Sequence, residues 1–125
     1  MTTDAFKGSL KAHQKKGFFK DLKINRGIER ESLRVTQKGN ISQKNHPENL
    51  GSPLTSKDIT TDFAEALVEL VTPTFESAEE LFNHLSLLHK FLYSEMGEEI
   101  LWNFSMPCAF QGEKEIRIAE YGESN

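Results

Sequence analysis

The sequence predicts an α+β fold in which helices pack against an antiparallel sheet. Apolar residues recur at spacings of three and four in two stretches, whereas another stretch alternates with period two, and turn residues separate them. At 125 residues, with 37% hydrophobic residues, the chain is long enough to form one hydrophobic core. A charged fraction of 27% without long apolar runs indicates a soluble protein.

The first predicted element is a weak amphipathic helix over residues 4–20. Phe6, Leu10 and His13 lie at helical spacing, and Asp4 is available as its N-cap. Residues 1–26 contain seven Lys or Arg against two Asp, a charge of +5, which leaves −9 for the remainder of a chain whose net charge is −4. Such a basic segment fits nucleic-acid binding or a solvated helix face. The interleaved apolar residues favour the solvated face, so no nucleic-acid partner is expected.

Residues 28–35 change to a period of two, which indicates a β-strand. The sequence Lys38-Gly39-Asn40 then predicts a turn, and a returning strand from Ile41 would complete a β-hairpin. Because side chains alternate along an extended chain, Glu29 and Glu31 should lie on one face of this hairpin.

The middle of the chain predicts a loop, a strand and a long helix. Residues 45–56 are rich in turn residues and should form a surface loop. Residues 64–71 are apolar at both strand and helix spacing, but β-branched residues and the closing Thr72-Pro73 favour a strand over 67–71. The strongest helix follows over 77–96, with Ser77 as cap and Gly97 as its stop.

The last part, residues 102–122, is aromatic and loop-rich. No further element follows it, so we expect the ordered fold to continue in chain beyond residue 125. Cys108 is the only cysteine, which excludes an internal disulfide, favours the cytosol and predicts a small buried residue. No apolar run approaches the roughly twenty residues of a membrane span, so no membrane partner is expected.

Paired carboxylates are the main chemical signal. Glu29 and Glu31 repel each other unless a cation bridges them, and a hard divalent ion such as Mg²⁺ suits carboxylate oxygens and nucleotide phosphates. Glu69 is a further candidate because it interrupts an apolar run, whereas Glu65 is expected to be an exposed acid. The alternative is a plain solvated sheet face, and the pattern alone leaves both open.

No glycine-rich phosphate-binding loop is present in the sequence. A bound nucleotide would therefore depend on metal and arginine, for which Arg30 and Arg34 are candidates.

Short motifs occur from Arg26 to the end of the chain. The first is the segment 26–35, RGIERESLRV. The others are His46-Pro47-Glu48, Leu50-Gly51-Ser52, TTDFAEAL over 60–67, Thr72-Pro73, Trp102 with SMPC over 105–108, and Tyr121-Gly122 with Ser124-Asn125. Together they resemble the bacterial glutamate–cysteine ligases of the proteobacterial type, in that family's order.

This resemblance implies part of a sheet like that of glutamine synthetase, whose acidic face holds magnesium and ATP. It implies Mg²⁺, with Mn²⁺ as a substitute, and L-glutamate, L-cysteine and ATP as substrates of the first step of glutathione synthesis. By motif position, Glu29, Glu31 and Glu69 fall where the family keeps metal-binding carboxylates, and Asp62 is a further acid at the same site. The resemblance assigns no catalytic residue.

Domain organisation follows from the extent of these motifs. Residues 1–25 form a helical leader, and 26–125 form the N-terminal part of a ligase catalytic domain. Because the family's members are several times longer, we expect a fragment or split part that is inactive alone and whose partner is the missing remainder. The alternative is a non-catalytic module, derived from the ligase, that binds nucleotide, glutamate or another protein.

Overall fold

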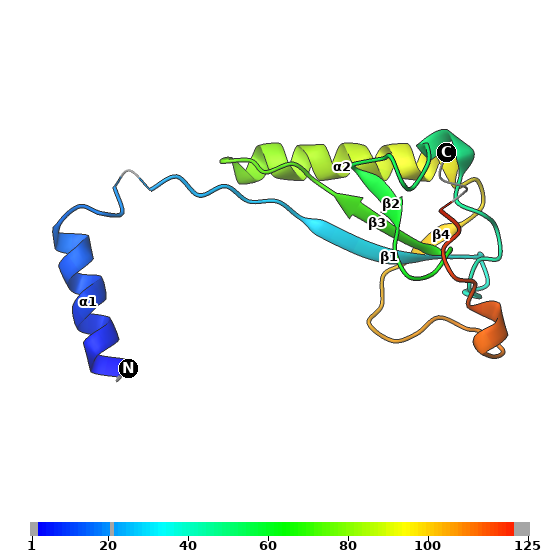
Figure 1. Ribbon diagram of the computed structural model, residues 1–125, viewed down its shortest axis with the longest axis horizontal. Coiled ribbons are helices and arrows are strands. Elements are labelled where there is room, and N and C mark those ends of the chain that lie inside the picture. The colour runs from blue at the N-terminus through cyan, green and yellow to red at the C-terminus, as the bar shows by residue number, and fades with distance from the viewer. Residues whose placement is uncertain (1–2, 21, 122–125) are drawn as a thin grey trace.

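The computed structural model describes residues 3–20 and 22–121, and it has the predicted α+β architecture. Within these residues, four strands form an antiparallel sheet in the order β2-β3-β1-β4, and a long helix covers one face (Figure 1). The elements are α1 (Thr3–Lys15), β1 (Glu29–Val35), β2 (Ile59–Thr61), β3 (Leu67–Val71), α2 (Ala78–Glu95), β4 (Ile100–Trp102) and the 3₁₀ turns η1 (Glu48–Leu50) and η2 (Glu113–Glu115).

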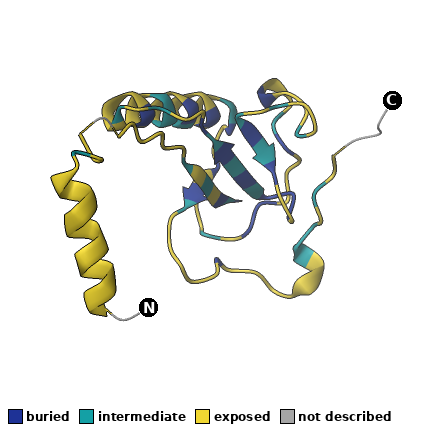
Figure 2. Ribbon diagram, turned by 60° about the vertical axis from the view of Figure 1, so that its left-hand side comes forward, coloured by how far each residue is buried: buried dark blue, intermediate teal, exposed yellow. Residues whose placement is uncertain are grey.

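Helix α1 stands away from the sheet and none of its residues is buried (Figures 1 and 2). It begins one residue before Asp4, which lies in the first turn and is therefore not the cap. It also ends earlier than predicted. The amide of Phe18 donates to the carbonyl of His13 at 3.1 Å, and Gly17 has a φ of +71°. This arrangement stops a helix because glycine adopts the left-handed conformation without a Cβ clash.

The predicted hairpin is only partly present. The turn forms as expected, since the Thr36 amide donates to the Asn40 carbonyl at 2.9 Å and Gly39 has a φ of +79°. The prediction of a returning strand from Ile41 is wrong, because only a single bridge forms there, between Val35 and Ile41. The Ile41 amide donates to Ala109 instead, so the chain leaves the hairpin and β1 finds its neighbours elsewhere.

The partners of β1 are β3 on one side and β4 on the other. The strand predicted over 67–71 is confirmed as β3, whereas β2 and β4 were not predicted. Each of these two strands has three residues, too few for a period of two to be visible in the sequence. They form because β3 and β1 offer backbone hydrogen-bonding groups beside them.

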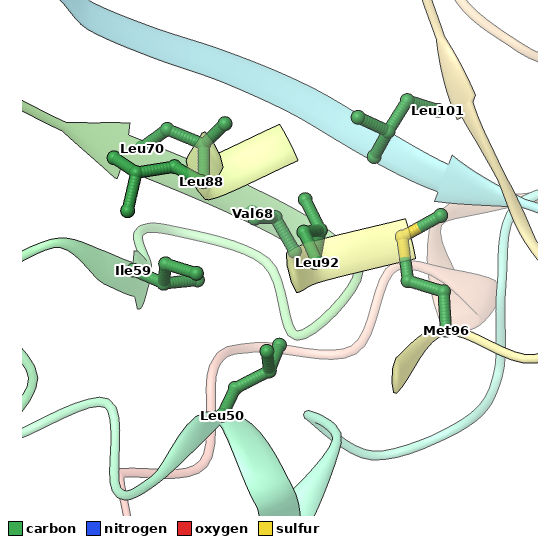
Figure 3. Packing of buried hydrophobic residues seen from close by; sticks show 8 residues of the cluster. All are labelled: Leu50, Ile59, Val68, Leu70, Leu88, Leu92, Met96 and Leu101. Carbon is green, nitrogen blue, oxygen red and sulfur yellow. The ribbon is translucent and has the colours of Figure 1, made fainter. Parts of the chain in front are cut away.

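Helix α2 is confirmed with its boundaries. The Ser77 hydroxyl accepts a hydrogen bond from the Glu80 amide at 3.3 Å, and the helix ends at Glu95, before Gly97. Its buried face packs on the sheet (Figure 3). The core consists of Leu50, Ile59, Val68, Leu70, Leu88, Leu92, Met96 and Leu101. Burying one such large side chain stabilises the fold by about 1.5–3 kcal/mol, so this contact contributes substantially to the stability.

A smaller core lies on the other side of the sheet and includes Cys108, which is buried as predicted. In the described part of the chain, no helix is both long and apolar enough to cross a bilayer.

Candidate functional site

The sheet face opposite α2 carries the predicted acids. Residues paired across neighbouring strands lie on the same face, and Glu31 is paired with Glu69, which is in turn paired with Thr60. Glu29 lies two residues before Glu31 and therefore on the same side. The sheet thus brings together Glu29, Glu31 and Glu69 on what we call the acidic face.

Asp62 reaches this face from outside the strands. It follows β2 directly and is exposed, in the segment that connects β2 to β3. Its charge is close enough to raise the pKa of Glu69. Asp62 is therefore within electrostatic reach of Glu69, which is paired with Glu31 in the sheet.

The pKa of Glu69 reports the electrostatics of the acidic face. Partial burial raises it first, and the charges of Glu31, Asp62 and Glu29 raise it further, in that order. Each of these causes disfavours the ionised form of Glu69. The face is therefore a region of uncompensated negative charge.

No basic side chain neutralises these acids among the residues that the structure describes. The ion pairs formed there are Lys23–Glu76, Arg34–Glu99 and Arg117–Glu120. Nor do any three His, Cys, Asp or Glu side chains of residues 3–20 and 22–121 gather closely enough to hold a metal ion by themselves. The donor set still fits a hard cation that takes some of its oxygens from elsewhere, because it consists of carboxylates.

Arg30 and Arg34, the predicted phosphate ligands, lie on the other face. Arg30 pairs with Leu70 of the core and Arg34 with Leu101, so both alternate with the acids. The guanidinium of Arg30 donates to the Asn103 side chain. Because side chains alternate along a strand, the period-two pattern that groups the acids also places these two arginines on the opposite side of the sheet.

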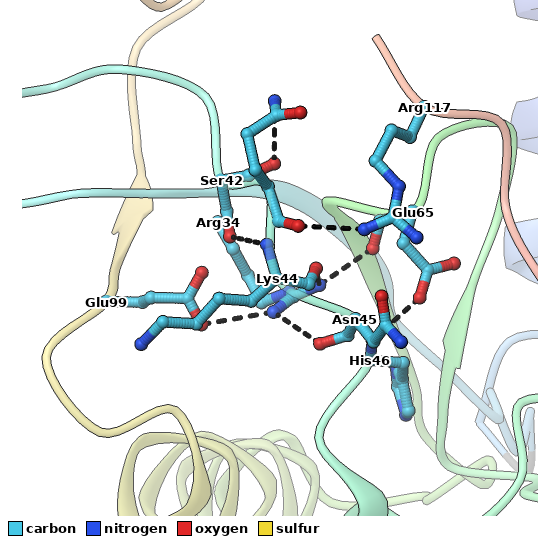
Figure 4. A network of polar contacts seen from close by, with 9 residues as sticks. Arg34, Ser42, Lys44, Asn45, His46, Glu65, Glu99 and Arg117 are labelled. Carbon is cyan, nitrogen blue, oxygen red and sulfur yellow. Dashed lines mark hydrogen bonds and ion pairs between the residues drawn. The ribbon is translucent and has the colours of Figure 1, made fainter. Parts of the chain in front are cut away.

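Arg34 is instead the centre of a buried polar network (Figure 4). It is 0% exposed and pairs with Glu99 at 3.1 Å. It also donates to the backbone carbonyls of Lys44, Asn45 and Glu65 at 3.0, 3.1 and 2.9 Å. Removing one partner of such a pair would leave a buried charge uncompensated. This network joins β1 to three loops.

Glu65 belongs to the same network, so the prediction of an exposed acid is wrong. Glu65 is 2% exposed. Its two carboxylate oxygens accept hydrogen bonds from the backbone amides of His46 and Glu120, both at 2.7 Å. Two charge-assisted hydrogen bonds offset the cost of burial. The local sequence pattern does not reveal the burial of Glu65, because its hydrogen-bond partners His46 and Glu120 come from distant segments.

Comparison with known proteins agrees with the motifs. A model of the glutamate–cysteine ligase family matches residues 8–125, which includes most of the tract before Arg26. The chain belongs to the glutamate–cysteine ligase family. The glutamate–cysteine ligase of Hahella chejuensis is 52% identical over 103 residues, and that of Pseudomonas putida strain W619 is 50% identical over 99 residues.

Two solved structures share the fold. The glutamate–cysteine ligase of Francisella tularensis, crystallised in complex with AMP, has a TM-score of 0.76 at 42% identity and covers 80% of this chain. A bifunctional glutathione synthetase from Pasteurella multocida has a TM-score of 0.71 at 38% identity and covers 75% of this chain.

The chain spans only a small part of each relative. It covers 20% of the Francisella ligase, 13% of the Pasteurella enzyme, and 19% and 20% of the Pseudomonas and Hahella ligases. The similarity to glutamate–cysteine ligases is thus to their N-terminal part. Of the ligase motifs quoted above, Gly122, Ser124 and Asn125 lie outside the described residues.

Proposed function

We propose that this chain supplies the carboxylate side of the magnesium and ATP site of a glutamate–cysteine ligase. Its acidic face, with Glu31 paired with Glu69 and with Glu29 and Asp62 beside them, is the observation that supports the proposal. Membership of the family and the AMP complex of the Francisella ligase support the nucleotide.

The proposed reaction joins the γ-carboxylate of L-glutamate to the amine of L-cysteine at the expense of ATP. The glutamate carboxylate attacks the terminal phosphate of ATP, which gives an acyl phosphate and ADP, and the cysteine amine then displaces phosphate. When bound, Mg²⁺ neutralises charge on the phosphates and positions them. Mn²⁺ would serve as a substitute.

In this scheme Glu29, Glu31, Asp62 and Glu69 hold the cation through carboxylate oxygens. Burial raises the pKa of Glu69, and repulsion from the other acids raises it further, so a bound cation would relieve part of an unfavourable interaction already built into the sheet. Phosphate oxygens of the nucleotide would complete the coordination. No side chain of this chain is assigned to the acyl transfer itself.

The remainder of the ligase supplies the other contacts in this proposal. Since the chain spans about a fifth of its relatives, we expect ion binding without ligation, and we place the protein in the cytosol. The second candidate is a module that binds nucleotide or glutamate, or a protein partner, without catalysis.

Titration of the 125-residue chain with Mn²⁺, followed by electron paramagnetic resonance, tests the proposal. We expect saturable binding that MgATP competes away, and no phosphate release with ATP, glutamate, cysteine and Mg²⁺. Glu113→Gln, on an exposed turn away from the acidic face, is the matched control and should bind Mn²⁺ like the parent chain. The absence of saturable binding would overturn the metal assignment.

Glutamate-dependent phosphate release, measured with and without an added ligase remainder, is the observation that would separate the two candidates. Release above the rate without protein would show that the chain carries out phosphoryl transfer by itself, against both the split-ligase scheme and the binding module. If phosphate appears only after a ligase remainder is added, the first candidate holds and the second is excluded.

A further inference from the structure

Asp62 is the one member of the acidic face that no strand holds. Glu29, Glu31 and Glu69 have backbones fixed by the ladder between β1 and β3, whereas Asp62 lies in the connection over residues 62–66. A connection of this kind moves more easily than a strand. Whatever fixes this connection therefore decides where the Asp62 carboxylate is.

A segment near the end of the described chain runs antiparallel to this connection. Ala64 and Ile118 form a bridge. The amide of Glu65 donates to the Arg117 carbonyl at 2.9 Å, and that of Ala119 donates to the Phe63 carbonyl at 3.1 Å. Residues 117–121 thus pair with a connection that lies more than fifty positions earlier in the sequence.

Two side chains extend this pairing at its ends. The buried Glu65 carboxylate accepts the Glu120 amide at 2.7 Å, and the Tyr121 hydroxyl lies 2.8 Å from the Asp62 carbonyl, to which it donates. The same hydroxyl is 3.4 Å from the Thr61 carbonyl. Tyr121 therefore contacts the backbone carbonyls of Thr61, the last residue of β2, and of Asp62. The chain leaves the sheet between these two residues.

The pairing is anchored to the centre of the molecule. The Glu65 carbonyl accepts a hydrogen bond from Arg34, which is 0% exposed and held by Glu99 (Figure 4). The connection thus has one end fixed by the buried network. Its other end, at Asp62, directly follows β2 and is contacted by the Tyr121 hydroxyl.

We infer that Tyr121 is a positioning residue for the acidic face: its hydroxyl fixes the backbone of Asp62 so that the carboxylate stays beside Glu69. The inference rests on the proposed function, because it gives the Asp62 carboxylate a role in cation binding. Tyr121 itself touches no reacting group in this scheme. Its effect passes through one backbone carbonyl.

Tyr121→Phe in the full 125-residue chain tests this inference, since it removes one hydroxyl from a side chain that is 39% exposed. We expect Mn²⁺ affinity to fall about three- to tenfold, the range of one net hydrogen bond, while the thermal midpoint of the metal-free chain falls by no more than a few degrees. Amide hydrogen exchange at Glu65 and Ala119 should become faster, without any metal present. Tyr93→Phe, on an exposed part of α2, is the matched control and should change neither quantity.

A double-mutant cycle with Asp62→Asn decides whether the effect passes through Asp62. In that background Tyr121→Phe should cause no further loss of Mn²⁺ affinity. An equal loss in both backgrounds overturns the inference, as does faster exchange without any change in affinity. If the parent chain binds no Mn²⁺, the proposed function fails first, whereas a parent that binds and a Tyr121→Phe variant that binds equally well refute only the positioning role.

Discussion

The two faces of the sheet are built from alternate residues of the same strands, but around β3 they differ in polarity and burial. On the side of α2, β3 contributes Val68 and Leu70, both 1% exposed, to the larger core. On the other side, the residue between them is Glu69, which faces Glu31. Adjacent positions of β3 thus have different roles: Val68 and Leu70 pack in the core, whereas Glu69 contributes charge to the acidic face.

This difference implies that stability and cation binding are separable in this chain. The α2 side stabilises the fold by removing apolar surface from water, which does not depend on ions. The acidic face carries repulsion that opposes folding until a cation relieves it. Substitutions in the core beside α2 should therefore leave cation affinity unchanged, whereas substitutions of the acids should weaken cation binding without lowering stability. The following predictions test that separation.

The largest effect is expected from Leu92→Ala on the α2 side. Leu92 is 0% exposed in the core, so the truncation should lower the free energy of unfolding by about 2–5 kcal/mol through lost burial and a cavity. Urea denaturation followed by circular dichroism measures it. Under folding conditions, Mn²⁺ affinity should stay the same, and a parallel loss of affinity would contradict the separation of the two faces.

Glu31→Gln should have the reverse signature. Removing one charge of the paired carboxylates should weaken Mn²⁺ binding about tenfold, the equivalent of about 1.4 kcal/mol. The metal-free chain should be as stable as the parent, or more stable by up to about 1 kcal/mol, because like charges paired across strands are destabilising. Calorimetric titration measures the Mn²⁺ affinity and urea denaturation measures the free energy of unfolding, with Glu113→Gln as the control for both. An unchanged Mn²⁺ affinity in Glu31→Gln would show that Glu31 is not part of the site.

A pH dependence should follow from Glu69. Its pKa is raised above the ordinary 4.5, so just above this value the folded chain binds more protons than the unfolded chain. The free energy of unfolding of the metal-free chain should therefore fall as the pH rises through that window. Urea midpoints from pH 4.5 to neutrality measure this contribution as the difference between the parent and Glu69→Gln, which should lack it; identical pH profiles would show that Glu69 is not the group responsible.

The smallest effect is expected from Phe82→Ser on the flank of α2. Phe82 is 65% exposed and lies outside the buried face of the helix, and serine has a similar helix propensity. The unfolding free energy should change by no more than about 0.5 kcal/mol. A loss comparable to that of Leu92→Ala would mean that the covered side of α2 is wider than the structure indicates.

The sequence by itself determined the elements whose signals are local. Ser77 and Gly97 mark the limits of α2 because capping depends on the nearest backbone groups, and the strand over 67–71 follows from its own side chains and the Thr72-Pro73 stop. Period-two alternation was enough to put Glu29 and Glu31 on one face. The motifs were enough to identify the family.

Only the tertiary structure decided what depends on distant partners. Strands β2 and β4 exist because longer neighbours offer hydrogen bonds, and the hairpin ends early because Ile41 bonds to Ala109. Glu65 and Glu69 belong to the same short stretch of sequence, yet one accepts amides from His46 and Glu120 while the other stands among acids. The surroundings of a carboxylate are set by segments dozens of residues away, and no local pattern records them.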